Sequence, residues 1–309
     1  MHVNQTHSLI AFVESLSDVK YASKIPKEIY LADYKNDEEF INKLKAIHKK
    51  LNKKAIYKHK KTKSLLEAIY IESLKSKNLN QLKTKIFAYK TSMKKNELEK
   101  YFHYLNQLLP KYEKSIWVKE YDKLISKKNE IMQLMNKHNY DRLIQKVAHF
   151  YHVDSEKMDK IDIAFYPIPS GDNVNAYRIK NLETVGVLVN KNQNLQWLLS
   201  ATILHEISHT IYSKSQIVKQ NFNIKNRHKR SNIVESMATS IGAGWGYEQI
   251  SGKLATIKWY NNKTYDKLAK IIYPTLKIYL DNDKKLDKNL IKYVKELLWN
   301  KLQWQILYN

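Results

Sequence analysis

The sequence predicts an α+β fold that is mainly helical, with a small mixed β-sheet between two helical regions. In the first half, apolar residues recur at helical spacing and no glycine precedes Gly171. Short runs rich in β-branched residues then occupy 161–190, as expected for strands. Helical spacing returns from Leu195. We therefore expect a helical N-terminal region over 1–155 and a second region over 156–309, which carries the sheet and ends in helices.

Helices are expected on both sides of the sheet. Leu9, Phe12 and Val13 share a face of the first helix, which Pro26 ends. Asp37 is the expected N-cap of the second, because two acids follow it in the first turn. Further N-terminal helices are expected in "SLLEAIYIESLKS", "KNELEKYFHYLNQLL" up to Pro110, and "DRLIQKVAHFYHV". The C-terminal stretch is helical again, with a kink or break at Pro274.

Basic residues strongly outnumber acidic ones. The chain has 54 Lys plus Arg against 30 Asp plus Glu, a formal net charge of +24, yet only four of the basic residues are arginine. Arginine is suited to bidentate contacts with phosphate and guanine, so its scarcity argues against nucleic-acid recognition. In 42–63, which contains no acid, the apolar spacing places the lysines on one helix face. A solvated basic surface is the favoured interpretation, and contact with a polyanion or a membrane surface is the alternative.

The composition restricts the metal ligands and the compartment. The chain has no cysteine, so a metal has to be held by His, Asp or Glu. No run reaches the roughly 18 apolar residues of a transmembrane helix, and the N-terminus lacks the features of a signal peptide. The absence of cysteine favours an exported protein whose signal has been removed over a cytoplasmic one.

Three strands are expected between the helical regions. "IDIAFYPIP" is a short apolar run ended by Pro167 and Pro169, "SGDN" is a turn, and "NVNAYRI" and "TVGVLVN" are rich in β-branched residues. The last strand is apolar over 185–189. We expect it to lie beside a cleft and to pair with an extended peptide.

The most informative motif is "HEISH". It falls near the end of "NQNLQWLLSATILHEISHTIYSK", which is expected to form one helix over 195–212 with Asn194 as N-cap. His205 and His209 are four residues apart, so both imidazoles can face one metal ion. Glu206 projects beside the ion, where a general base has to stand to accept a proton from metal-bound water.

A second helix carries the expected third ligand. Between His209 and Glu248 the only acid is Glu235, in "SNIVESMATSIGAGWGY". Two histidines and a glutamate are a common ligand set for catalytic zinc, and the small residues after Glu235 let its helix approach the first closely. The alternative is a surface acid favoured by the helix dipole. We expect Ser231 or Asn232 to cap this helix, and Gly242, Gly244 and Gly246 to end it.

Other histidines are weaker candidates for a metal site. His228 is the alternative third ligand, but Arg227 and Lys229 flank it and disfavour a dication. His149 and His152 are three residues apart and have no acid at helical spacing, so a core or surface role is expected for them.

"HEISH", followed after a loop by "ESMA", resembles the gluzincin branch of zinc metallopeptidases, whose pattern is HExxH and then Glu-x-x-Ala on the next helix. The match covers 185–242, and the wider layout is similar to that of uncharacterised bacterial proteins of this type. The resemblance implies a zincin-like catalytic core with one Zn²⁺ per chain. It further implies that His205, His209 and Glu235 bind the zinc and that Glu206 is the catalytic base.

The activity that this resemblance implies is hydrolysis of a peptide or protein substrate by zinc-activated water, with Glu206 moving the proton. A second donor, usually Tyr or His, should stabilise the oxyanion, and the candidates are Tyr247, Tyr260 and His228. The absence of an aminopeptidase-type Gly-Ala-Met-Glu-Asn strand favours an endopeptidase. One residue departs from the family pattern, because Val234 stands where many gluzincin peptidases have Asn. The alternatives are an inactive zinc site and a non-enzymatic basic protein that binds an anionic partner.

Overall fold

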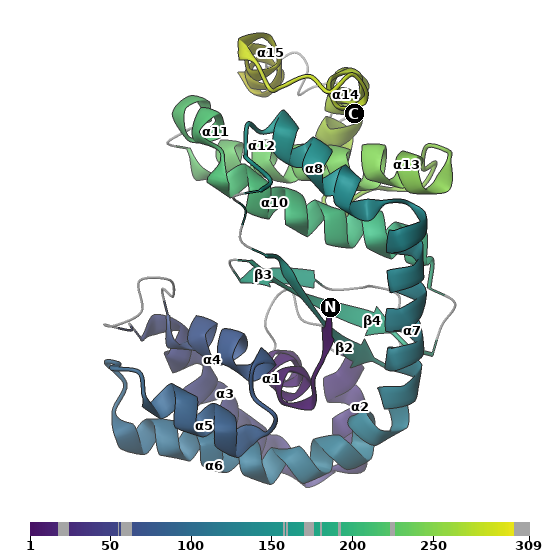
Figure 1. Ribbon diagram of the computed structural model, residues 1–309. Coiled ribbons are helices and arrows are strands. Elements are labelled where there is room, and N and C mark those ends of the chain that lie inside the picture. The colour runs from purple at the N-terminus through teal and green to yellow at the C-terminus, as the bar shows by residue number, and fades with distance from the viewer. Residues whose placement is uncertain are drawn as a thin grey trace. The chain divides into compact units, whose positions relative to one another are not determined.

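The computed structural model describes residues 1–17, 25–54, 56, 64–156, 158, 160–169, 176–179, 181–190, 193–222 and 226–299. In this part the chain is mainly helical and carries one four-stranded sheet, which confirms a mainly helical α+β fold (Figure 1). The turn predicted at 170–173 and the lysine-rich stretch 57–63 lie outside the described residues.

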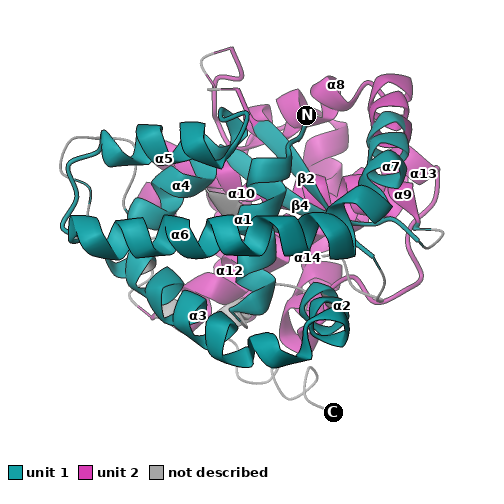
Figure 2. Ribbon diagram, turned by 90° about the horizontal axis from the view of Figure 1, so that it is seen from below, with its two compact units in different colours: residues 1–129, 162–193 teal, residues 130–161, 194–309 magenta. Residues whose placement is uncertain are grey.

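The chain folds as two compact units. Unit 1 comprises residues 1–129 and 162–193, and unit 2 comprises residues 130–161 and 194–309 (Figure 2). The units do not coincide with the expected regions 1–155 and 156–309, because the sheet belongs with the N-terminal helices. Strand β1 (His2–Val3) pairs with the first strand of the expected sheet, and the N-terminal helices α1 (Gln5–Leu16) and α4 (Leu65–Leu74) also contact the sheet.

The sheet is mixed, as expected, and has the strand order β1-β2-β4-β3. β2 (Asp162–Ile168) runs parallel to β1 and to β4 (Leu182–Leu188), whereas β3 (Ala176–Ile179) runs antiparallel to β4. The three expected strands are thus confirmed. β1 was not foreseen, because two residues are too few to show the alternation that identifies a strand.

The position of β4 limits one expectation. The strand pairs with β2 along its whole length and with β3 over 182–185, so it is an inner strand. Backbone groups already paired on both sides are not free to bind an extended peptide. The prediction that 185–189 pairs with a substrate is therefore wrong at Val185, where β3 occupies the free side, and stays a prediction for 186–189.

Helices make up most of unit 1, and α1 lies in its core. α1 begins where the Asn4 side chain accepts the backbone N–H of His7 at 3.0 Å, and Leu9, Ile10 and Val13 are fully buried. The helices of this unit and the start of the next are α1 (Gln5–Leu16), α2 (Ile25–Asp33), the 3₁₀ turn η1 (Lys35–Asp37), α3 (Glu38–Lys53), α4 (Leu65–Leu74), α5 (Leu79–Phe87), α6 (Lys95–Tyr112), the π-helical η2 (Glu113–Trp117) and α7 (Val118–Lys137).

Proline does not end the sixth helix, contrary to expectation. α6 continues through Pro110 into η2 and then α7. Pro110 removes one backbone donor, but Leu108, Tyr112 and Ile116 are buried on both sides of it. Burial of these apolar residues outweighs the local cost of the proline. Pro274 likewise lies inside a continuous helix, α14.

Unit 2 contains helices and the loops that connect them, and no strand in its described part. They are α8 (Tyr140–Phe150), α9 (Leu195–Trp197), the π-helical η3 (Leu198–Leu204), α10 (His205–Lys214), α11 (Gln216–Asn221), α12 (Arg227–Thr239), the π-helical η4 (Ser240–Gly246), α13 (Tyr247–Ser251), α14 (Lys263–Asp281) and α15 (Lys288–Trp299). α9, η3 and α10 follow one another without a break, which confirms the single long helix expected there. Its N-cap is Asn194, whose side chain accepts the backbone N–H of Trp197 at 3.0 Å.

The helix that carries Glu235, α12, is longer than predicted at both ends. Asn226 is its N-cap, in place of the expected Ser231 or Asn232, and accepts the backbone N–H of Lys229 at 3.1 Å. The helix then passes through its three glycines as η4 and ends only at Gly252, which has a φ of 75°. Only Gly252 among these glycines adopts the left-handed conformation that stops helices.

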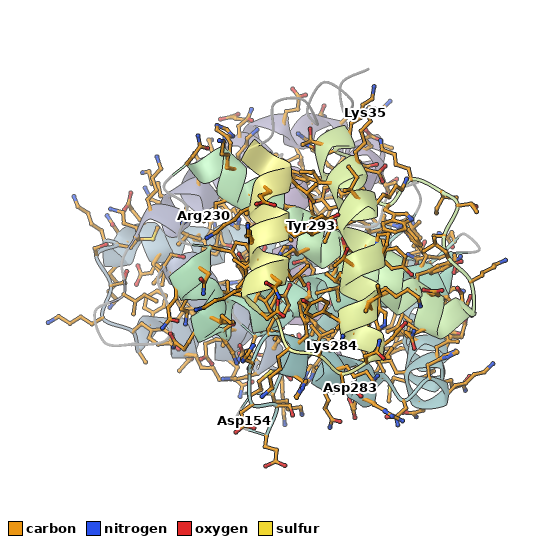
Figure 3. All side chains as sticks on the ribbon, turned by 90° about the horizontal axis from the view of Figure 1, so that it is seen from above. Lys35, Asp154, Arg230, Asp283, Lys284 and Tyr293 are labelled. Atoms are coloured by element: carbon orange, nitrogen blue, oxygen red, sulfur yellow. The ribbon has the colours of Figure 1, made fainter. Side chains whose placement is uncertain are left out.

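The surface is rich in lysine. None of the buried residues in the described part is a lysine, and Figure 3 shows charged side chains such as Lys35 extending into solvent. Exposed lysines fit both a solvated basic surface and one that contacts an anionic partner, so the preference for the first stays a prediction. Within the described residues, no helix combines the length and the apolar character needed to span a membrane.

Candidate metal centre

Three side chains of unit 2 bring their polar atoms together between α10 and α12. His205 Nε2 and His209 Nε2 are 3.0 Å apart. Glu235 Oε2 lies 3.6 Å from the first nitrogen and 3.5 Å from the second. Among the described residues, these three form the one group of His, Asp or Glu side chains arranged to hold a metal ion. They are the three predicted ligands.

The spacing of the three atoms fits a zinc ion. A triangle with sides of 3.0, 3.5 and 3.6 Å has a circumscribed circle with a radius of about 2.0 Å, and zinc binds histidine nitrogen at roughly 2.0–2.1 Å and carboxylate oxygen at roughly 2.0–2.2 Å. One zinc ion could therefore reach all three atoms at normal bond lengths. Three protein ligands are the number that catalytic zinc sites use, with the fourth position left for water or substrate.

Burial and charge both favour a cation at this point. The side chains of His205, His209 and Glu235 are 6%, 11% and 25% exposed. Burial alone would raise the pKa of the Glu235 carboxyl, but its hydrogen bonds and charge interactions with the two histidines outweigh burial and hold that pKa well below its usual range. Glu235 therefore stays ionised, and a half-buried carboxylate beside two imidazoles is a good acceptor for a dication.

Two glycines of η4, which continues α12, allow this helix to lie close to the helix formed by η3 and α10, which carries the two histidines. A Cβ atom at Gly242 would stand 2.7 Å from the backbone oxygen of Ser200 and 3.0 Å from His205 Cβ. A Cβ atom at Gly246 would stand 2.5 Å from Leu204 Cδ2. Both contacts involve π-helical turns, η3 and η4, which are rare and are often found at functional sites. The close approach predicted from the small residues is confirmed, although the glycines serve this contact and not the helix end.

Small hydroxyl residues fix the other side of the Glu235 helix. Ser240 Oγ donates to the backbone oxygen of Ala269 at 2.8 Å, and Ser236 Oγ donates to that of Tyr265 at 3.4 Å. Both acceptors lie on α14. The helix that carries Glu235 is thus held between α10 and α14, so the Glu235 carboxylate sits on a rigid support.

Glu206, the predicted base, is partly exposed and lies next to the cluster. No hydrogen bond or ion pair engages its carboxylate within the described part of the chain. Its charge is felt by Tyr260, whose pKa is raised by burial, by Glu235 and by Glu206. Glu206 therefore lies close enough to Tyr260 for its charge to act on the hydroxyl that contacts Glu235.

Of the three candidates for a second donor, the structure brings only Tyr260 to the cluster. Its hydroxyl donates to Glu235 Oε2 at 3.2 Å, and its ring stacks on that of His205 with the centroids 5.7 Å apart. Tyr247 is 8% exposed and packs against Trp197. His228 is exposed and lies seven residues before Glu235, which is roughly 10 Å along the helix.

The remaining candidate histidines make structural contacts. His149 Nε2 donates to the backbone oxygen of Asp283 at 3.1 Å, and His152 Nε2 donates to that of Leu286 at 2.7 Å. These carbonyls belong to the turn between α14 and α15. The two histidines therefore tie α8 to that turn.

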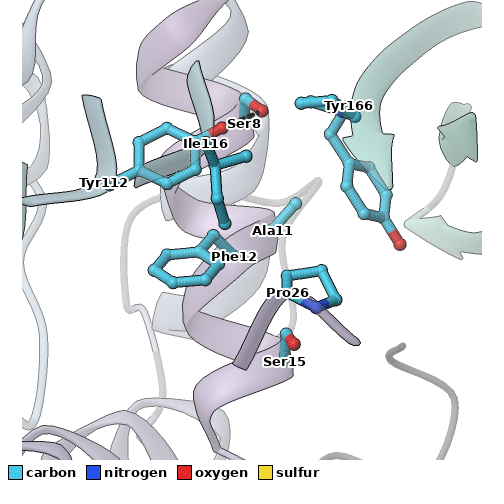
Figure 4. Close-up of a pocket in the computed structure, with 9 residues that line it drawn as sticks. Ser8, Ala11, Phe12, Ser15, Pro26, Tyr112, Ile116 and Tyr166 are labelled. Atoms are coloured by element: carbon cyan, nitrogen blue, oxygen red, sulfur yellow. Dashed lines mark hydrogen bonds between the residues drawn. The ribbon is translucent and has the colours of Figure 1, made fainter. Parts of the chain in front are cut away.

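A small pocket in unit 1 is not a substrate site. Phe12, Tyr112 and Tyr166 are among the residues that line it (Figure 4). Its free volume of ≈ 10 Å³ corresponds to about one water molecule. None of its lining side chains is charged, so it has none of the chemistry of the metal cluster.

Comparison of the chain with protein-family models, with curated proteins and with solved structures finds no match. What the cluster does therefore has to be inferred from its own geometry.

Proposed function

We propose that this chain is a zinc-dependent metallopeptidase with a zincin-like core, in which His205, His209 and Glu235 hold one Zn²⁺. The observation that carries the proposal is the triangle of ligand atoms, whose dimensions match zinc bond lengths. Two further features support it. The ligands are largely buried on two closely packed helices, and an unengaged carboxylate, Glu206, stands beside them.

The residues around the cluster have distinct roles in this proposal. When bound, the zinc would make a water molecule acidic enough to attack at neutral pH and would polarise the scissile carbonyl. Glu206 accepts the proton of the attacking water and delivers it to the leaving amine. Tyr260 is the candidate donor whose hydroxyl reaches the cluster, and it would leave Glu235 Oε2 to donate to the oxygen of the substrate on which negative charge develops. An internal peptide bond of a peptide or protein is the expected substrate.

Glu206→Gln tests this assignment, because it removes the base and keeps the size of the side chain. We expect the variant to bind zinc as the parent does and to lose about 10²- to 10⁴-fold in kcat. The measurement is cleavage of an unbiased peptide library, with and without a chelator, together with metal analysis. Glu296→Gln, at an exposed position on α15, is the matched control and should cleave normally.

The outcomes separate the alternatives. Cleavage that survives in Glu206→Gln would contradict the assigned base. A parent protein that binds zinc but cleaves no peptide would point to an inactive site or to another hydrolysis. The ends of the cleaved peptides also decide between internal cleavage, which we expect, and removal of N-terminal residues.

A further inference from the structure

Tyr260 reaches the metal cluster from a loop whose outer part is exposed. The segment 252–258 connects α13 to the tyrosine, and Leu254 and Ile257 in it are 44% and 56% exposed. The Tyr260 hydroxyl nevertheless donates to Glu235 Oε2 at 3.2 Å, and a contact of this kind tolerates little movement. Some group therefore has to fix the backbone at the end of this loop.

Asp266 makes the contacts that fix it. This side chain is 9% exposed, and its Oδ1 accepts the backbone N–H of Trp259 at 2.6 Å and that of Tyr260 at 3.1 Å. Its Oδ2 binds Lys270 Nζ at 3.0 Å. Both oxygens of one carboxylate are thus used, one on the loop and one on the charge that holds the carboxylate in place.

The neighbouring tryptophan strengthens the same attachment. The Trp259 ring packs on that of Tyr273, with the centroids 5.3 Å apart, and Lys270 Nζ lies 5.7 Å from the tryptophan ring. A Cβ atom at Gly244 would stand 2.6 Å from the Tyr273 ring and 3.0 Å from the Trp259 ring, so the glycine makes room for this pair of rings. The loop end is therefore held by its backbone through Asp266 and by the side chain before Tyr260.

We infer that Asp266 is a positioning residue, which holds the Tyr260 hydroxyl on Glu235 by binding the amides of Trp259 and Tyr260. The inference rests on the proposed function, since the tyrosine matters to catalysis only if Glu235 binds zinc. Asp266 itself touches none of the three ligands in any contact that the described residues make. Its effect on the site has to pass through Tyr260.

Amide exchange in the metal-free protein tests the attachment itself. Asp266→Ala leaves the amides of Trp259 and Tyr260 without their acceptor, and we expect them to exchange about 10- to 100-fold faster. Asp266→Asn keeps an acceptor oxygen and should retain most of the protection. Exchange rates unchanged in Asp266→Ala would overturn the inference.

Zinc affinity, measured by competition with a chromophoric chelator, tests the consequence. A partner that orients a ligand is typically worth about 10- to 100-fold in metal affinity, so Tyr260→Phe and Asp266→Ala should each weaken zinc binding to a similar extent. Because Asp266 acts through Tyr260, the double variant should bind zinc no more weakly than Tyr260→Phe alone. Additive losses would overturn the inference.

A matched control separates this effect from a general loss of stability. Asp287 also accepts a backbone amide, that of Leu290 at 2.9 Å, and a tyrosine hydroxyl, that of Tyr279. Asp287→Ala should therefore leave the Trp259 and Tyr260 amides and the zinc affinity unchanged. If the parent protein binds no zinc, the proposed function fails, while the exchange of the two amides still decides whether Asp266 holds Tyr260.

Discussion

His205, Glu206 and His209 are residues whose arrangement follows from local geometry alone. Their spacing on a helix decides which side chains share a face, so sequence is enough to place them. Glu235 needed a further assumption, that the next helix packs closely. Tyr260 was one of three candidates, and nothing local distinguishes it from Tyr247. Its position depends on a loop held by tertiary contacts, which the sequence does not reveal.

His7 is a buried residue whose titration should affect stability. Its ring nitrogens contact Ser73 Oγ at 2.9 Å and Thr184 Oγ1 at 3.2 Å, and burial lowers its pKa from 6.5 to about 3. The unfolded chain therefore binds a proton below pH 6.5 that the folded chain excludes down to about pH 3. Stability contributed by His7 is present above pH 6.5 and falls as the pH falls through this window.

We expect this effect to be visible in chemical denaturation between pH 7.5 and 5. Relative to His7→Gln, the unfolding free energy of the parent should fall by about 2 kcal/mol over that range. His103→Gln is the control, because His103 is exposed. Parallel pH profiles for the parent and His7→Gln would show that His7 is not excluded from protonation.

At the scale of the elements, the helices η3 and η4 show why glycine is hard to interpret from sequence. Glycine both ends helices and permits close packing, and the two uses share one signature. In this chain Gly242 and Gly246 serve packing, whereas Gly252 ends the helix. Whether a glycine ends a helix or permits close packing depends on what lies next to it in the fold. For Gly242 and Gly246 this is η3, which is about 40 residues earlier in the chain.

Gly242→Ala should damage the metal site through this packing. The added methyl would meet the Ser200 carbonyl, which belongs to the backbone and cannot rotate away, so we expect a loss of about 1–3 kcal/mol in stability. Zinc affinity should fall as well, because the helix of His205 has to shift. Gly252→Ala is the matched control: its cost of about 1–2 kcal/mol comes from the left-handed backbone alone. Equal zinc affinity in the two variants would contradict the role of Gly242.

For the whole molecule, periodicity was enough to predict a mainly helical fold with a small sheet, but not the grouping of its parts. The sheet joins unit 1 through β1, a strand of two residues that no pattern reveals, and through contacts with α1 and α4, which are distant in the sequence. The helix end expected at Pro110 and the break offered as one alternative at Pro274 are wrong for a related reason. Buried contacts made by residues far apart in the sequence outweigh the local preference of proline.

The net charge of +24 should act on substrates only at long range. The Debye length falls from about 30 Å at 0.01 M salt to about 3 Å at 1 M, so steering of an acidic peptide should disappear over this range. We expect kcat/KM for an acidic peptide to fall to that of its neutral analogue while kcat stays constant. A preference for acidic peptides that survives 1 M salt would instead indicate direct contacts in the site.

The central claim is that one zinc ion is held by His205, His209 and Glu235. The most direct measurement is the metal content of the purified, folded protein and its variants. We predict close to one zinc per chain in the parent, loss of zinc in His205→Ala and in Glu235→Ala, and unchanged zinc in His228→Ala. A folded parent protein that binds no zinc, or a Glu235→Ala variant that retains it, would contradict the claim.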